Sequence, residues 1–278
     1  MDRRHTRLLP RLHLGQPMTK VLIAPVTVTP TKALTPSHLK GLLWVDVMYR
    51  ATALVADTTY RYSNTTYNVT AQTLGFWEYL DRTHGDINYS THPEEEIGKL
   101  YVSYQAEPER APFAALRPYL EAVENAGWVH PASSRLLEVW TGYFARLGMH
   151  DPGLTRTQPP SMGLEEMVEH LAIRNLCLDN RPTGGPVYLD ATKYGIPLRQ
   201  IVTREDQPNY LAAALRELIP LIEHYDETVL VHDQELTPDY ILLQRVLDTL
   251  GGTTLRVAVD RVPIDGVITS SRHGDWLG

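Results

Sequence analysis

The sequence predicts an α/β fold with a parallel sheet, in which a mostly helical segment separates the two halves of the sheet. Residues 21–28 form an apolar run that is typical of a buried strand, and a loop and a long apolar helix follow it. Residues 228–259 read as strand, helix and strand, and a connection of this length is typical of parallel strands. Between these regions, apolar residues recur at helical spacing.

Composition excludes several classes of protein. The chain has 278 residues, which is enough for one or two domains, and a formal net charge of -7, which argues against a broadly basic nucleic-acid-binding surface. The single Cys177 excludes an internal disulfide and a Cys-rich metal site, as is usual in a reducing cytoplasm, where we expect the protein to act. The histidines are scattered and no apolar run is membrane-length, so we expect neither a metal site nor a membrane span.

The N-terminal residues 1–18 are expected to be a flexible leader outside the fold. The first seventeen contain four Arg and one Asp and lack the long apolar core of a secretory signal. An Arg-rich leader of this kind also resembles an organelle transit peptide, although an extension ahead of a second start at Met18 is the simpler interpretation.

The first strand is followed by a helix start that suits an anion. Thr35 can cap the helix and Pro36 is tolerated at its first position. Ser37, His38 and Lys40 then lie in the first turn, where free N–H groups and the helix dipole favour negative charge. An ordinary buried strand, loop and helix without a ligand fits this stretch equally well.

The next segments lead from a short strand into the helical insertion. Residues 58–62 predict a strand, and residues 63–73 predict a polar loop in which Asn64 is either a site residue or a surface turn-former. Helical spacing then predicts helices near residues 76–80, 94–104, 116–126, 134–147 and 164–176. Gly127 and Gly148 suit helix C-termini, and the many aromatic residues here are expected to form core.

The second half returns to strands. Residues 187–190 and 198–203 are short apolar runs, residues 209–219 are helical, and residues 228–231 form a buried strand that Asp233 and Gln234 follow. A helix at 239–250 and a strand at 255–259 complete the unit. Ligands of parallel sheets bind beyond the carboxyl ends of the strands, so we expect Asp233 and the first helix N-terminus to share one crevice.

Together, the two ends of the chain resemble the catalytic domain of class I aminoacyl-tRNA synthetases, most nearly the arginyl-tRNA synthetases. That family has S-P-N-x-A-K-P-x-H-x-G-H-L-R after its first strand, where this chain has T-V-T-P-T-K-A-L-T-P-S-H-L-K. Lys32 falls on the family's lysine, His38 on the second His of the HIGH motif and Lys40 on the basic residue after it. Near the end, I-T-S-S-R-H-G-D resembles the family's K-M-S-T-R-K-G-N loop, a form of the KMSKS motif.

Both motifs are degenerate in this chain, because several of the family's motif residues are replaced. Thr35 replaces the first His of HIGH, Ser37 its Gly, and Ile268 the first Lys of the KMSKS loop. Nothing resembling an anticodon-binding helical domain is seen in the sequence, unless the native chain continues past Gly278. Lys32 is therefore expected to supply the positive charge that Ile268 cannot.

The resemblance implies a Rossmann-type catalytic domain formed from residues 19–73 and 184–278, with residues 74–183 as a helical insertion. It also implies ATP-dependent activation of an amino acid, with Mg²⁺ accompanying the ATP. The residues implied at the site are Lys32, His38 and Arg272 for catalysis, Thr35, Ser37, Lys40, Gly41, Ser270 and Ser271 for ATP, and Thr29, Asn64, Tyr210, Asp233 and Gln234 for the amino acid.

Three functions stay open on the sequence. The first is an enzyme that passes an activated amino acid to a small-molecule or peptide amine. The second is transfer to tRNA. The third is a non-catalytic relative that only binds, which the Thr35 and Ile268 replacements favour. The sequence identifies neither the amino acid nor the acceptor, nor the oligomeric state.

Overall fold

The core of the fold is a four-stranded parallel sheet. The computed structural model describes residues 18–24, 28–62, 70–156 and 159–263. Strands β1 (Lys20–Ala24), β2 (Asp57–Tyr60), β6 (Glu227–Asp233) and β7 (Thr254–Val259) lie in the order β2-β1-β6-β7, and every neighbouring pair is parallel. The predicted parallel pairing of the first strand with the strand at 228–231 is therefore confirmed.

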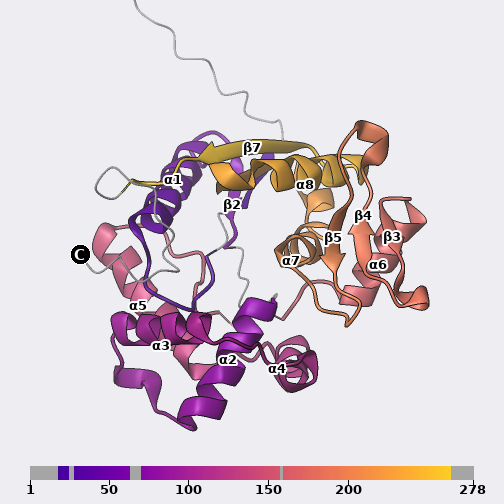
Figure 1. Cartoon of the computed structure of the whole chain (residues 1–278). Helices are drawn as coiled ribbons and strands as arrows, with labels where there is room; N and C mark the ends of the chain where they lie inside the picture. Colours follow the sequence, from indigo (N-terminus) through magenta and orange to yellow (C-terminus); the bar gives the residue numbers. More distant parts are fainter. Residues whose placement is uncertain (1–17, 25–27, 63–69, 157–158, 264–278) are drawn as a thin grey trace, which may run out of the picture.

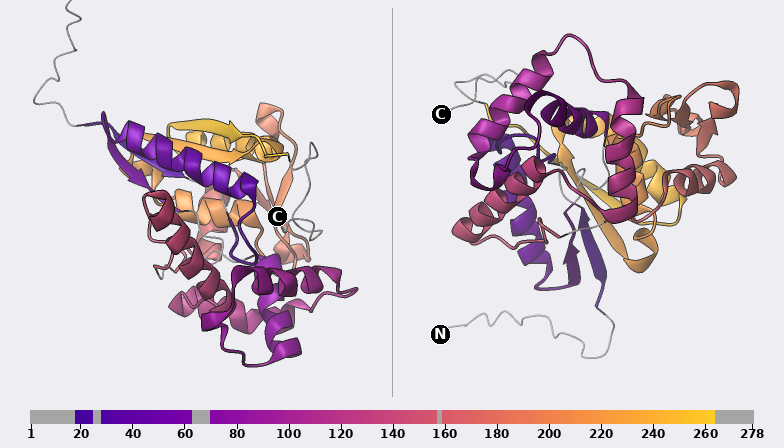
Figure 2. Two further views of the ribbon diagram at one scale, coloured as in Figure 1. Left: turned by 90° about the vertical axis from the view of Figure 1, so that its left-hand side faces the viewer. Right: turned by 90° about the horizontal axis from the view of Figure 1, so that it is seen from below.

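Helices cover both faces of this sheet. Side chains alternate along β1, so Val21 and Ile23 pack with Val45 of α1 (Pro36–Thr52). Leu22 and Ala24 face the opposite way, into the apolar cluster shared with α7 (Tyr210–Leu218) and α8 (Thr237–Thr249). The views in Figures 1 and 2 show α1 on the side of the sheet away from α8. Burial on both faces explains why the central strand β1 is apolar without interruption from Val21 to Ala24.

Four helices form a separate packed layer with its own core: α2 (Ala71–His84), α3 (Glu94–Ala106), α4 (Phe113–Ala126) and α5 (Pro131–Leu147). Trp77, Trp140 and Phe144 are buried in it, which confirms the expectation that aromatic residues here are core. Gly127 and Gly148 end α4 and α5 in the left-handed conformation, as expected of helix-terminating glycines. In Figure 1 this layer lies below the sheet.

Residues 184–278 were expected to contribute only to a parallel sheet. Part of this range instead belongs to a second, smaller sheet. Strands β3 (Cys177–Asp179), β4 (Val187–Leu189) and β5 (Arg199–Val202) pair antiparallel with one another, beside α6 (Leu164–Ile173). Their connections are short turns, and a parallel pair needs a crossover of a dozen or more residues. The division at residue 183 remains a prediction, and the core cluster beneath this sheet includes residues from both sides of it.

Short 3-10 turns join these elements at Tyr89–Thr91, Arg181–Thr183, Thr192–Tyr194, Ile222–His224 and Gln234–Leu236.

One buried ion pair ties the helical layer to the rest of the molecule. Arg216 of α7 is 1% exposed and binds both carboxylate oxygens of Glu124 of α4, at 2.8 and 2.6 Å. Its Nε also donates to the carbonyl of Met162 at 2.7 Å. The relative placement of α4 and α7 thus depends on one fully enclosed guanidinium.

Candidate functional site

The N-terminus of α1 is organised by a reciprocal cap. Thr35 Oγ1 accepts a hydrogen bond from the backbone N–H of His38 at 3.3 Å, and His38 Nδ1 accepts one from the backbone N–H of Thr35 at 3.3 Å. This is the capping-box arrangement, with His in the place where Glu or Gln is usual. Thr35 was expected at the ATP site, and its observed contact is this cap.

The environment of His38 decides its protonation, and the cap decides which ring nitrogen carries the proton. Burial, and then the positive charges of Lys32 and Arg261, lower the pKa of His38 to about 4. The ring is therefore neutral near pH 7, and since Nδ1 accepts a hydrogen bond, Nε2 carries the proton. His38 is a neutral N–H donor fixed in orientation by its own helix.

The helical layer holds the loop before α1. Ser133 Oγ of α5 donates to the carbonyl of Pro30 at 2.7 Å, and accepts from Trp77 Nε1 at 2.9 Å. The Lys32 ammonium lies 5.5 Å from the centre of the Tyr101 ring of α3, at the distance of a cation–π contact. Two helices thus position the loop that carries Lys32 against the end of β1.

Charged groups gather where β6 and β7 end. Asp233 is the last residue of β6, and burial raises the pKa of its carboxyl. Arg261, two residues past the end of β7, lies with its guanidinium 2.8 Å from a Glu235 oxygen and 3.6 Å from an Asp233 oxygen. Carboxylates and a guanidinium therefore meet at the carboxyl edge of the sheet.

The segment after β7 is bound directly to the first turn of α1. Lys40 Nζ donates to the carbonyl of Asp260 at 2.7 Å, and the backbone N–H of Val262 donates to Ser37 Oγ at 2.9 Å. These bonds occupy two of the residues expected at the ATP site. They also bring the ends of β6 and β7 and the N-terminus of α1 to one edge of the sheet, as the rule for parallel sheets predicts.

Two enclosed polar atoms at this edge have no hydrogen-bond partner among the described residues. They are Oγ1 of Thr31 and Nε2 of His232, and each side chain is 1% exposed. Burying a polar group unpaired costs free energy, so each such atom needs an explanation. Both flank the residues discussed above, Thr31 beside Lys32 and His232 beside Asp233.

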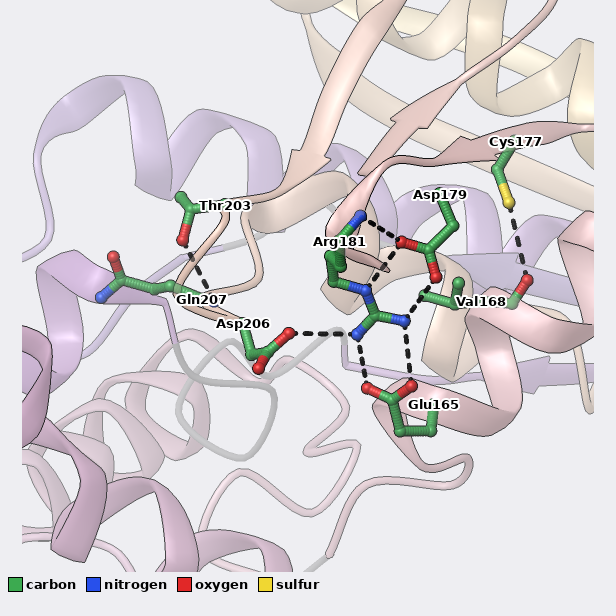
Figure 3. A network of polar contacts seen from close by, with 8 residues as sticks. All are labelled: Glu165, Val168, Cys177, Asp179, Arg181, Thr203, Asp206 and Gln207. Carbon is green, nitrogen blue, oxygen red and sulfur yellow. Dashed lines mark hydrogen bonds and ion pairs between the residues drawn. The ribbon is translucent and has the colours of Figure 1, made fainter. Parts of the chain in front are cut away.

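Tyr210 begins α7, and its hydroxyl donates to the Asp239 carboxylate in the first turn of α8. Figure 3 shows how the loop before it is fixed: the Arg181 guanidinium contacts carboxylates of Glu165, Asp179 and Asp206. Because these carboxylates surround it, the pKa of Arg181 is raised further, and the charge is permanent. The loop that leads to Tyr210 is therefore anchored by a charge network.

The remaining predicted site residues are spread along the same elements or lie outside the described ones. Thr29 accepts a backbone bond from Thr31, Gly41 is buried within α1, and Gln234 opens the turn after β6. Asn64, Ser270, Ser271 and Arg272 lie outside the described residues. The contacts that surround α1 bring together Lys32, His38, Lys40 and Asp233, with Arg261 added.

Arg261 was missed by the sequence reasoning. The signal that selected Asp233 applies to it equally, because Arg261 follows the strand β7 just as Asp233 ends β6. Its importance comes from position beyond a parallel strand rather than from any motif.

Among the described residues, no group of three or more His, Cys, Asp or Glu side chains is placed to hold a metal ion. No helix in the described part of the chain has the length and apolar character needed to cross a membrane.

Comparisons with known proteins give the fold. No protein-family model matches the chain, and no curated protein matches its sequence. Arginyl-tRNA synthetase from Thermus thermophilus matches in structure with a TM-score of 0.64 and 16% identity, over 92% of this chain and 51% of that one. The arginyl-tRNA synthetase of Plasmodium falciparum matches with a TM-score of 0.55 and 11% identity, over 90% and 44%. The chain spans about half the length of these structures, and it has the fold of the arginyl-tRNA synthetases over that length.

Proposed function

We propose that the protein activates an amino acid with ATP and passes the aminoacyl group to a small-molecule or peptide amine. The observation that carries the proposal is the cluster of Lys32, His38 and Arg261 at the N-terminus of α1, where the ends of β6 and β7 meet it. Two cations, a neutral N–H donor and a helix N-terminus form a setting that favours phosphate oxygens.

The chemistry needs charge stabilisation more than acid–base work. The carboxylate oxygen of the amino acid attacks the α-phosphorus of ATP, an O–P bond forms and the bond to pyrophosphate breaks. Lys32 and His38 Nε2–H would stabilise the negative charge on the phosphate oxygens during this step, and Mg²⁺ would arrive with the ATP. Asp233, at the end of β6, would hold the amino group of the amino acid as an ion pair.

The second step transfers the aminoacyl group. The amine attacks the carbonyl carbon of the adenylate, AMP leaves, and the amine loses a proton to give an amide. A formal net charge of -7 supports a small acceptor over a polyanionic one, because binding a nucleic acid requires neutralising many phosphates.

Amino-acid-dependent exchange between ATP and labelled pyrophosphate tests the first step. Lys32→Ala should slow this exchange by about a hundred- to a thousand-fold, since it removes a preorganised charge near the phosphates. Lys193→Ala is the matched control, because Lys193 also lies over a tyrosine ring, at 5.1 Å from Tyr194, but away from α1. Equal exchange by parent and Lys32→Ala would refute the role of Lys32, and no exchange with any amino acid would refute the activity.

Transfer to tRNA is the second candidate, supported by the names of the solved structures that share the fold. Adding tRNA or candidate amines to the activated enzyme separates the two. Consumption of the adenylate only in the presence of tRNA would favour this candidate. Binding of ATP or an amino acid without exchange would leave a binding module as the function.

A further inference from the structure

Arg261 links three elements of the proposed site. Its side chain is 28% exposed and reaches from the end of β7 to the end of β6, where the guanidinium contacts Glu235 at 2.8 Å and Asp233 at 3.6 Å. The guanidinium is buried enough for its neighbours to fix its orientation, and exposed enough for a ligand to reach it.

The backbone around Arg261 is fixed to α1 on both sides. The carbonyl of Asp260 accepts from Lys40 Nζ, and the N–H of Val262 donates to Ser37 Oγ. Arg261 is the residue between them, so its backbone is held close to the first turn of the helix. Its charge helps to lower the pKa of His38, which agrees with this proximity.

The chemistry of this location fits a phosphate group. A guanidinium presents two parallel N–H donors to phosphate oxygens, and a helix N-terminus adds favourable partial charge. Arg261 would act together with Lys32, because the charges of both residues lower the pKa of His38 in this first turn.

We propose that Arg261 is a phosphate-binding residue of the ATP site, held by Asp233 and Glu235 until the triphosphate takes the place of Glu235. This inference rests on the proposed function. The exchange of partners requires little free energy, because the Glu235 side chain is 57% exposed and ion pairs at such positions contribute little.

Titration calorimetry with ATP and with adenosine tests the inference. Arg261→Gln should weaken ATP binding by about ten- to a hundred-fold and leave adenosine binding unchanged, since only the phosphates lose a charge-assisted hydrogen bond. Arg256→Gln is the matched control, because Arg256 lies on β7 and binds the Gln244 side chain instead. The control should bind ATP as the parent does.

A second variant should act in the opposite direction. Glu235→Gln removes a competitor for Arg261 and should tighten ATP binding by about two- to fivefold. Histidine-selective NMR adds a readout that needs no nucleotide: in Arg261→Gln the pKa of His38 should rise, and only by a small part of the whole shift, because burial and the charge of Lys32 remain.

The outcomes are distinguishable. If the parent binds ATP and Arg261→Gln binds it equally well, the inference is overturned while the proposed function stands. If the parent binds no ATP, both are overturned. An unchanged His38 pKa in Arg261→Gln would overturn the placement of the guanidinium itself.

Discussion

Acidification should destabilise this protein through His38, and the size of the effect follows from its environment. The pKa of His38 is about 4 in the folded protein and 6.5 in an unfolded chain. Between these values the unfolded chain binds the proton more tightly, so stability is fully present above about pH 6.5 and falls as the pH falls toward 4. A difference of about 2.5 pH units corresponds to a loss of about 3 kcal/mol.

The variant His38→Gln isolates this contribution. Glutamine suits the same position of a capping box, because its side-chain oxygen can accept the Thr35 N–H, but it does not titrate. We compare the free energy of unfolding of the parent with that of the variant. The parent's value relative to the variant's should be about 3 kcal/mol lower near pH 4 than near pH 7. All other titrating groups are common to both proteins and cancel in the comparison.

Urea denaturation followed by circular dichroism at several pH values between 7 and 4 measures both free energies of unfolding. Parent and His38→Gln curves that run parallel across this range would refute the reasoning, because His38 would then titrate equally in both states. A divergence that begins above about pH 7 would also contradict it, since histidine in an unfolded chain is already neutral there.

Other predictions concern stability and reactivity. Ser133→Ala should lower the free energy of unfolding by about 1–3 kcal/mol, because it leaves a buried donor and a buried acceptor unpaired, whereas the neighbouring Ser134→Ala should cost less; urea denaturation compares them. Glu124→Gln should cost about 3 kcal/mol in the same assay by leaving the enclosed Arg216 charge without its partner, and an unchanged midpoint would contradict this. The Cys177 thiol, whose pKa burial raises to about 11, should react with iodoacetamide near pH 8 only after unfolding, and rapid labelling of the native protein, read by mass spectrometry, would contradict its burial.

Local sequence patterns were sufficient to predict most of the helices and strands. The apolar run before residue 28 and the Thr35-Pro36 start predicted β1 and α1 in their observed order. The strand–helix–strand pattern from residue 228 predicted β6, α8 and β7, and Gly127 and Gly148 marked helix ends. These signals are local because hydrophobic periodicity, capping and the left-handed conformation depend on residues within one or two turns.

Pairing of the short strands was less predictable. The sequence indicated strands at residues 187–190 and 198–203, but not that they pair antiparallel with β3 in a sheet of their own. An apolar run of four residues suits either kind of sheet, and the choice depends on the length of the connections and on which face finds a partner.

The sequence by itself determined the order of the elements, the helix cap at Thr35 and the candidate residues that follow parallel strands. Only the tertiary structure decided which side chains meet there. Arg261 pairs with Asp233 and acts on His38 through its charge, and Ser133 bonds to Pro30 across more than a hundred residues of sequence. Local periodicity carries no information about such contacts, because packing of whole helices and strands brings their partners together.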